Sequence, residues 1–147
     1  MAESAHSAWL ARISMTGLTV SDAPAPDDAP SVEEAWQSVI NWEVEPVAKI
    51  PLTHPRALQE VDRQWRAHAL GEDLFSADDS FLLSISGTGS WSFGWAMVKW
   101  APGVELSARL VNRGEVLNFV AMSLDGKSVC AVTEEDDDYW IVVQHLR

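Results

Sequence analysis

Cysteine is nearly missing from this chain, which has one, Cys130, among its 147 residues. An intramolecular disulfide is therefore excluded, and the count fits a reducing compartment. Because Cys130 lies in an apolar run, residues 129–132, we expect it to be a small buried hydrophobic residue rather than a reactive thiol.

Long apolar runs are missing as well. No run approaches the roughly 18 apolar residues that a membrane-spanning helix needs. The first residues lack the basic start and the unbroken apolar stretch of a signal peptide. Together with the cysteine count, these features favour a cytoplasmic protein.

Basic residues are scarce, with 10 Lys and Arg against 22 Asp and Glu and a net charge of −12. A nucleic-acid binder needs clustered Lys and Arg for phosphate contacts, so this balance disfavours DNA and RNA as partners. It disfavours an anionic membrane surface for the same reason. It favours solubility and attraction to basic proteins.

Recognisable catalytic and cofactor motifs are absent too. The glycine-rich stretch at residues 87–94 has no following Gly-Lys-Ser/Thr and precedes an expected strand instead of a helix, so we interpret it as a hairpin turn and not a phosphate loop. The four histidines lack the spacing of a zinc site, and no pattern selects a catalytic set. They are His6, His54, His68 and His145. We therefore predict no cofactor, no metal and no enzyme activity.

The chain does contain eight tryptophans, which are expected to dominate a core. Residues 8–15 alternate loosely, so that Trp9, Ala11, Ile13 and Met15 would share one strand face, although a short helix fits almost as well. Residues 22–30 hold three prolines and three aspartates and are typical of an extended, solvated connector.

Two helices are predicted next. Ser31 and Glu34 form a capping-box pattern at the start of a helix that reaches to about Trp42. A second helix begins at Pro55 and ends near Gly71. The proline-containing stretch between them, residues 44–51, has room for a short edge strand at most.

The rest of the chain has period-two patterning broken by turn signals. The expected strands are 81–86, 91–100, 104–111, 116–123, 128–133 and 139–146, five or six according to whether the fourth and fifth are counted together. An Asp-Gly pair at residues 125–126 favours a tight hairpin. We therefore predict one α+β domain over residues 1–147, with an N-terminal strand or arm and connector (1–30), a helical part (31–71) and an antiparallel sheet (81–147).

The expected fold places both helices on one face of a five- to six-stranded antiparallel meander. In the strand at 91–100 the aromatic side would then meet Trp36 and Trp65 of the helices. That side consists of Trp91, Phe93, Trp95 and Met97.

The densest local anomaly is a run of five carboxylates followed by two aromatic residues. Its members are Glu134, Glu135, Asp136, Asp137, Asp138, Tyr139 and Trp140. A calcium loop would need acids at alternate positions, a central Gly and a closing Glu, none of which is present. Two interpretations stay open: a solvated hairpin turn, and a docking surface for basic residues of a partner, with Tyr139 and Trp140 as aromatic anchors.

These features together favour a stoichiometric inhibitor of the immunity or antitoxin type. It would neutralise a basic toxin or a nucleic-acid-acting enzyme by presenting carboxylates in place of phosphates. One alternative is a pocket-forming cone domain, a small-molecule binder or enzyme, lined by Trp36, Trp65, Trp91 and Trp95, with His68 or His145 as acid or base. Another alternative is a secretion chaperone that binds an extended segment by strand addition.

Overall fold

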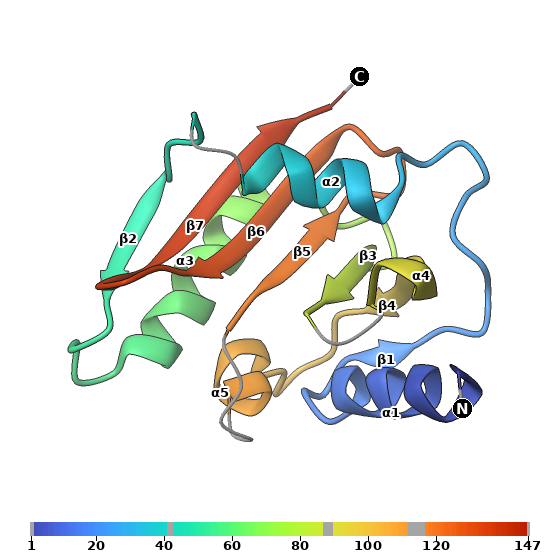
Figure 1. Cartoon of the computed structure of the whole chain (residues 1–147), viewed down its shortest axis with the longest axis horizontal. Coiled ribbons are helices and arrows are strands. Elements are labelled where there is room, and N and C mark those ends of the chain that lie inside the picture. Colours follow the sequence, from blue (N-terminus) through green and yellow to red (C-terminus); the bar gives the residue numbers. More distant parts are fainter. Residues whose placement is uncertain (1, 41–42, 87–89, 112–116, 147) are drawn as a thin grey trace.

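The structure, a computed structural model, describes residues 2–40, 43–86, 90–111 and 117–146. Within these ranges the chain forms a seven-stranded antiparallel sheet with strand order β1-β4-β3-β5-β6-β7-β2, flanked by helices (Figure 1). The elements in chain order are α1 (Ala2–Ser14), β1 (Thr19–Val20), α2 (Val32–Val39), β2 (Ala48–Pro51), α3 (Ala57–Gly71), β3 (Ser80–Ile85), α4 (Ser90–Phe93), β4 (Ala96–Lys99), α5 (Leu106–Val111), β5 (Phe119–Met122), β6 (Ser128–Glu134) and β7 (Asp138–His145). The mixed helix-and-sheet class is as expected.

The helices do not all cover one face of the sheet, so that part of the prediction is wrong. Figure 1 shows α2 in front of β6 and β7 and α3 behind them. Trp36 of α2 and Trp65 of α3 accordingly belong to two different buried clusters. Because helices cover both faces of the sheet, its central strands have no solvent-exposed side. All four residues of β5 are accordingly buried.

The N-terminal segment is a helix and not a strand. Trp9 and Ile13 are four residues apart and both are buried, which is the spacing of one helix face. The Trp9 indole donates a hydrogen bond to the Ile85 carbonyl at 2.9 Å and so ties α1 to β3. Met15, which the strand alternative placed on the same face, is 53% exposed.

Helices α2 and α3 are confirmed, with small shifts at their ends. Ser31 caps α2 and forms the reciprocal capping box with Glu34. The helix ends at Val39, and Trp42 lies outside the described residues. Helix α3 begins at Ala57, two residues after Pro55, and Gly71 is its last residue.

The connector at residues 22–30 is fixed to the body of the protein at its C-terminal end. The Trp95 indole donates a hydrogen bond to the Pro30 carbonyl at 2.8 Å. Gly126, in the Asp-Gly turn between β5 and β6, packs so tightly that a Cβ there would lie 2.5 Å from the Pro30 ring. The exposed aspartates of the connector are therefore carried by a partly anchored segment.

Two expected strands are wrong in whole or in part. Residues 90–93 form the short helix α4, and the strand β4 starts only after Gly94, which has a positive φ of 74°. Residues 106–111 form α5, whose Ser107 amide donates to both oxygens of the Asp62 carboxylate at 2.9 and 3.2 Å. Because β3 lies between β4 and β5, the sheet is not a simple meander.

The remaining strands lie close to their predicted ranges. β3, β5, β6 and β7 are present, and the Asp-Gly turn joins β5 to β6. The short strand β2 pairs with β7 at the edge of the sheet. Of the glycine-rich stretch interpreted as a turn, residues 87–89 fall outside the described residues. Among the described helices, none has both the length and the apolar character to span a bilayer.

Candidate functional site

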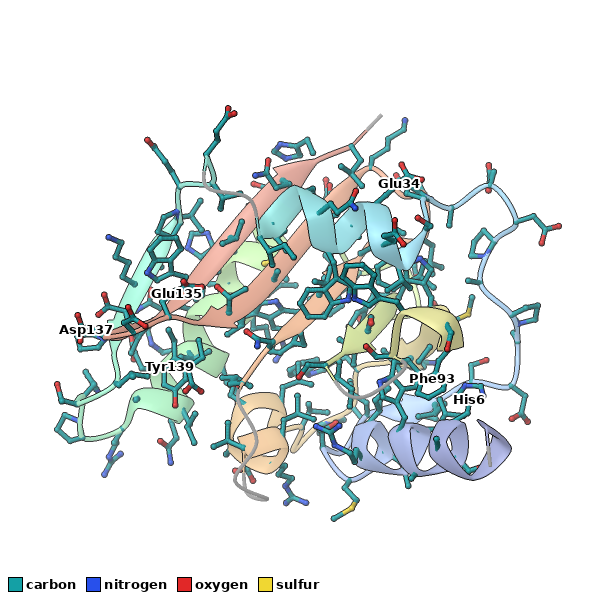
Figure 2. All side chains as sticks on the ribbon, viewed as in Figure 1. His6, Glu34, Phe93, Glu135, Asp137 and Tyr139 are labelled. Carbon is teal, nitrogen blue, oxygen red and sulfur yellow. The ribbon has the colours of Figure 1, made fainter. Side chains whose placement is uncertain are left out.

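The acidic run forms the tip of the β6–β7 hairpin. Its backbone is closed by a hydrogen bond from the Glu135 amide to the Asp138 carbonyl at 2.8 Å. Side chains of Glu135, Asp136 and Asp137 are exposed, and Figure 2 shows Glu135 and Asp137 at this tip. We call these three residues the acidic tip. A second strand holds the tip in place, since the Leu52 amide after β2 donates to the Asp137 carbonyl at 3.0 Å.

No cation of the described chain neutralises the acidic tip. Ion pairs within the described residues join Arg63 to Glu60, Arg109 to Glu105 and His145 to Glu72, and none reaches Glu135, Asp136 or Asp137. Like charges held this close repel one another unless water or an external cation compensates them. The tip therefore presents uncompensated negative charge on a hydrogen-bonded frame.

The two outer members of the acidic run, Glu134 and Asp138, are held by contacts with other parts of the chain. The Glu134 carboxylate accepts a hydrogen bond from the Leu117 amide at 3.0 Å, and the Glu134 amide donates to the Asn118 side chain at 3.1 Å. Glu134 therefore holds the chain that leads into β5. Asp138 is half-buried and pairs with Pro51 of β2.

The two aromatic residues after the run lie on opposite faces of β7. Tyr139 is 8% exposed and belongs to the cluster that also holds Trp65, so its ring does not project toward a partner. Trp140 is half-buried on the α2 face, and the Lys49 ammonium lies over its ring, 5.2 Å from the centroid. A cation already stacks on this ring, which is the interaction that a basic partner would also offer.

A second set of exposed carboxylates lies along the chain before, within and after α2, and we call it the surface around α2. Residues 21–47 contain seven carboxylates and no Lys, Arg or His, and all seven of these residues are exposed. They are Asp22, Asp27, Asp28, Glu33, Glu34, Glu43 and Glu45. The signal was in the sequence as a long stretch without a single cation.

The four tryptophans proposed to line a pocket do not all come together, although Trp95 packs against the buried cluster that contains Trp36. Trp36 and Trp65 are 5% and 0% exposed on opposite faces of the sheet, while Trp91 is 44% exposed. His145 lies at the surface beside Glu72, and His68 is half-buried on α3. Within the described ranges no three His, Cys, Asp or Glu side chains are placed to hold a metal ion.

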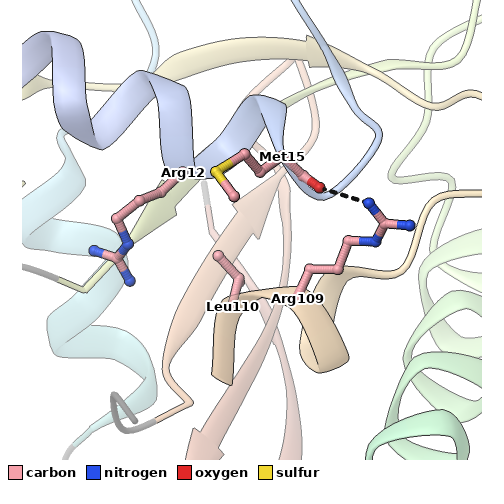
Figure 3. A pocket seen from close by; sticks show the side chains of 4 residues that line it. All are labelled: Arg12, Met15, Arg109 and Leu110. Atoms are coloured by element: carbon pink, nitrogen blue, oxygen red, sulfur yellow. Dashed lines mark hydrogen bonds between the residues drawn. The ribbon is translucent and has the colours of Figure 1, made fainter. Parts of the chain in front are cut away.

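A small hollow lies between α1 and α5 (Figure 3). Arg12, Met15, Arg109 and Leu110 line it, and its volume of about 10 Å³ is close to the minimum for one water molecule. Arg109 donates to the Met15 carbonyl at 3.2 Å, and Arg12 donates to the Ser86 carbonyl at 3.0 Å. These arginines tie elements together, and the space is too small for a ligand.

Cys130 is buried in β6, as expected. Burial raises the pKa of its thiol far above the ordinary range, with a smaller contribution in the same direction from the charge of Glu72. The thiolate that nucleophilic or redox chemistry requires is therefore not formed near neutral pH.

Comparison with known proteins gives no family for this chain. No protein-family model matches it, and neither the curated proteins nor the solved structures contain a significant match.

Proposed function

We propose that this protein is an acidic binding protein that neutralises a basic protein partner by stoichiometric binding, as immunity proteins and antitoxins do. The partner would be a toxin or a nucleic-acid-acting enzyme with a cationic site. The observation that carries the proposal is the acidic tip, three exposed carboxylates without an ion-pair partner among the described residues.

The physical basis is imitation of phosphate charge. An enzyme that acts on nucleic acid gathers Lys and Arg to bind the backbone, and closely spaced carboxylates can occupy the same cationic site. The tip joins β6 to β7, and this hairpin is paired on its two outer sides with β5 and with β2. Because this backbone is already ordered, less conformational entropy is lost on binding than a flexible acidic tail would lose.

The remaining charge supports the encounter between the partners. With a net charge of −12, the protein as a whole attracts a basic partner from a distance and raises the association rate. Trp140, half-buried on β7 two residues after the β6–β7 turn, would supply an aromatic contact that slows dissociation.

The edge strand β2 favours this proposal over strand addition. Lys49 is charged and exposed, and Pro51 has no amide to donate to an added strand. Charged residues and proline are the devices by which edge strands avoid further pairing.

The test is partner capture from the native source with matched variants. The immobilised wild-type chain is compared with a tip variant, Glu135→Ser, Asp136→Ser and Asp137→Ser, and with a connector variant that changes the same number of exposed carboxylates. The connector variant carries Asp22→Ser, Asp27→Ser and Asp28→Ser. Captured proteins are identified by mass at low salt and after a high-salt wash.

We expect the wild type and the connector variant to retain one basic protein at low salt, and the tip variant to lose it. The three tip side chains are exposed, so the tip variant should keep its thermal stability, which a circular dichroism melt verifies. Equal retention by the tip variant, or equal loss by the connector variant, would show that the tip is not the docking site.

A further inference from the structure

A groove runs along the outer side of α3, on the sheet face that α2 does not cover. Arg66 and Leu70 of α3 form one wall, and Trp100 and Val104, between β4 and α5, form the other. Its volume is about 540 Å³, within the range of sites that bind small organic molecules. The groove uses neither the acidic tip nor the surface around α2.

One wall of the groove contains a fixed aromatic ring, that of Trp100. Trp100 stacks on Trp65 with 6.1 Å between ring centroids and meets the edge of Phe75 at 5.8 Å. Its amide donates to the Asp79 carbonyl at 2.9 Å. These contacts hold the ring in position, so that it fixes the residues packed against it without a further entropic cost of ordering on binding.

The cationic group of the groove lies directly over this ring. The Arg66 guanidinium is 4.6 Å from the Trp100 centroid. Arg63, one turn earlier, is engaged by Glu60, whereas no carboxylate among the described residues forms an ion pair with Arg66. In a chain with more than twice as many acidic as basic residues, an arginine that keeps its planar donors free beside a ring is available to an external anion.

The acidic residue of the groove, Asp62, already accepts hydrogen bonds from the protein backbone. Both oxygens of Asp62 accept from the Ser107 amide at the start of α5, so this carboxylate holds the groove wall and Arg66 is the group left to bind an anion. Leu70 is 53% exposed and adds apolar surface next to the ring.

We propose that this groove binds a small amphipathic anion, with an apolar or aromatic body against Leu70 and Val104, beside the stacked Trp100 and Arg66, and a carboxylate on the guanidinium of Arg66. The inference is independent of the proposed function, because it uses a different surface and a different class of ligand.

The experiment compares three probes of equal shape and different charge by isothermal titration calorimetry. Indole-3-acetate is the anion, indole-3-acetamide is the neutral isostere and tryptamine is the cation. A charge-assisted hydrogen bond contributes about 1.5–3 kcal/mol, so we expect the anion to bind about tenfold or more tightly than the neutral probe, and the cation to bind most weakly.

Variants test whether the preference for the anionic probe arises in the groove. Arg66→Gln should remove the preference for the anion, whereas Arg56→Gln, the same charge change at an exposed position before α3, should keep it. Leu70→Ser should weaken both indole probes together and leave the fold intact, because the side chain is exposed. Equal affinity for the anion and its neutral isostere, or an unchanged preference in Arg66→Gln, would overturn the proposal. A dimer that dissociates in Arg66→Gln would instead assign the groove to a second copy of the chain and overturn it as well.

Discussion

Truncating Trp65 should remove a large part of the stability of the whole domain. The side chain is fully buried, its ring contacts those of Phe75, Phe81, Trp100 and Phe119 at 5.5–6.1 Å, and its indole donates to the Cys130 carbonyl at 3.1 Å. Removal of a buried Trp side chain costs about 3–5 kcal/mol, because the cavity refills only in part. Domains of this kind unfold with about 5–15 kcal/mol, so Trp65→Ala should lower the urea midpoint sharply.

Trp65→Phe separates the two contributions. Phenylalanine retains much of the ring packing and loses the indole hydrogen bond, which contributes about 1 kcal/mol, together with some buried area. We expect a loss of about 1–2 kcal/mol for this variant. Urea unfolding followed by far-ultraviolet circular dichroism measures both variants without depending on tryptophan emission. A loss below about 1 kcal/mol for Trp65→Ala, with an unchanged denaturant slope, would show that α3 does not anchor this face of the sheet.

Three further predictions test other parts of the structure. Gly126→Ala should destabilise the protein by more than about 1 kcal/mol, because the positive φ of 74° and the Pro30 ring, 2.5 Å from the new Cβ, both oppose a side chain. Gly71→Ala is the control: the space around Gly71 is open, so this variant should be neutral or stabilising. Thermal melts of both variants measure the difference. Ser31→Ala should lower the unfolding free energy by about 1 kcal/mol through loss of the α2 cap, and an unchanged melting temperature would contradict the capping geometry. Burial raises the pKa of Asp62 above its ordinary 3.8, so the folded state binds this proton more tightly than the unfolded state and the contribution of Asp62 to stability falls as pH rises from about 3.8 through the raised pKa. In urea titrations the unfolding free energy of the wild type, relative to that of Asp62→Asn, should therefore fall between acidic and neutral pH. A difference between the two proteins that does not change with pH would contradict the raised pKa of Asp62.

The parts of the fold that the sequence predicted correctly are those specified by local chemistry. The capping box at Ser31 and Glu34 is complete within four residues, and the Asp-Gly turn before β6 needs only a glycine with positive φ. Helix α5 shows the opposite case. The Asp62 carboxylate, 45 residues earlier in the chain, accepts a hydrogen bond from the first turn of this helix, whereas residues 104–111 by themselves show only an alternating apolar pattern.

The assignment of helices to sheet faces was also beyond the local pattern. Trp36 and Trp65 each lie on an amphipathic helix, but periodicity does not say which face of a sheet a helix will cover. The apolar runs of β5 and β6, buried on both sides, carried the available signal, because a strand with one solvated face alternates.

For the candidate site, exposure of the acidic tip followed from charge density alone. Adjacent residues of a strand point to opposite faces, but the sequence did not indicate that the face of Tyr139 is the one covered by Trp65 and that of Trp140 the one covered by α2. Arg66 gave no sequence signal, because its stacking on Trp100 joins segments that only the tertiary structure brings together.

The most direct test of the central claim is a titration of the captured basic partner's own activity with purified protein. If the acidic tip occupies the partner's cationic site, activity should fall linearly to zero at one equivalent of wild type. The connector variant should give the same titration, whereas the tip variant should leave the partner active at that ratio. Full activity in the presence of excess wild type, or equal inhibition by the tip variant, would contradict neutralisation through the acidic tip.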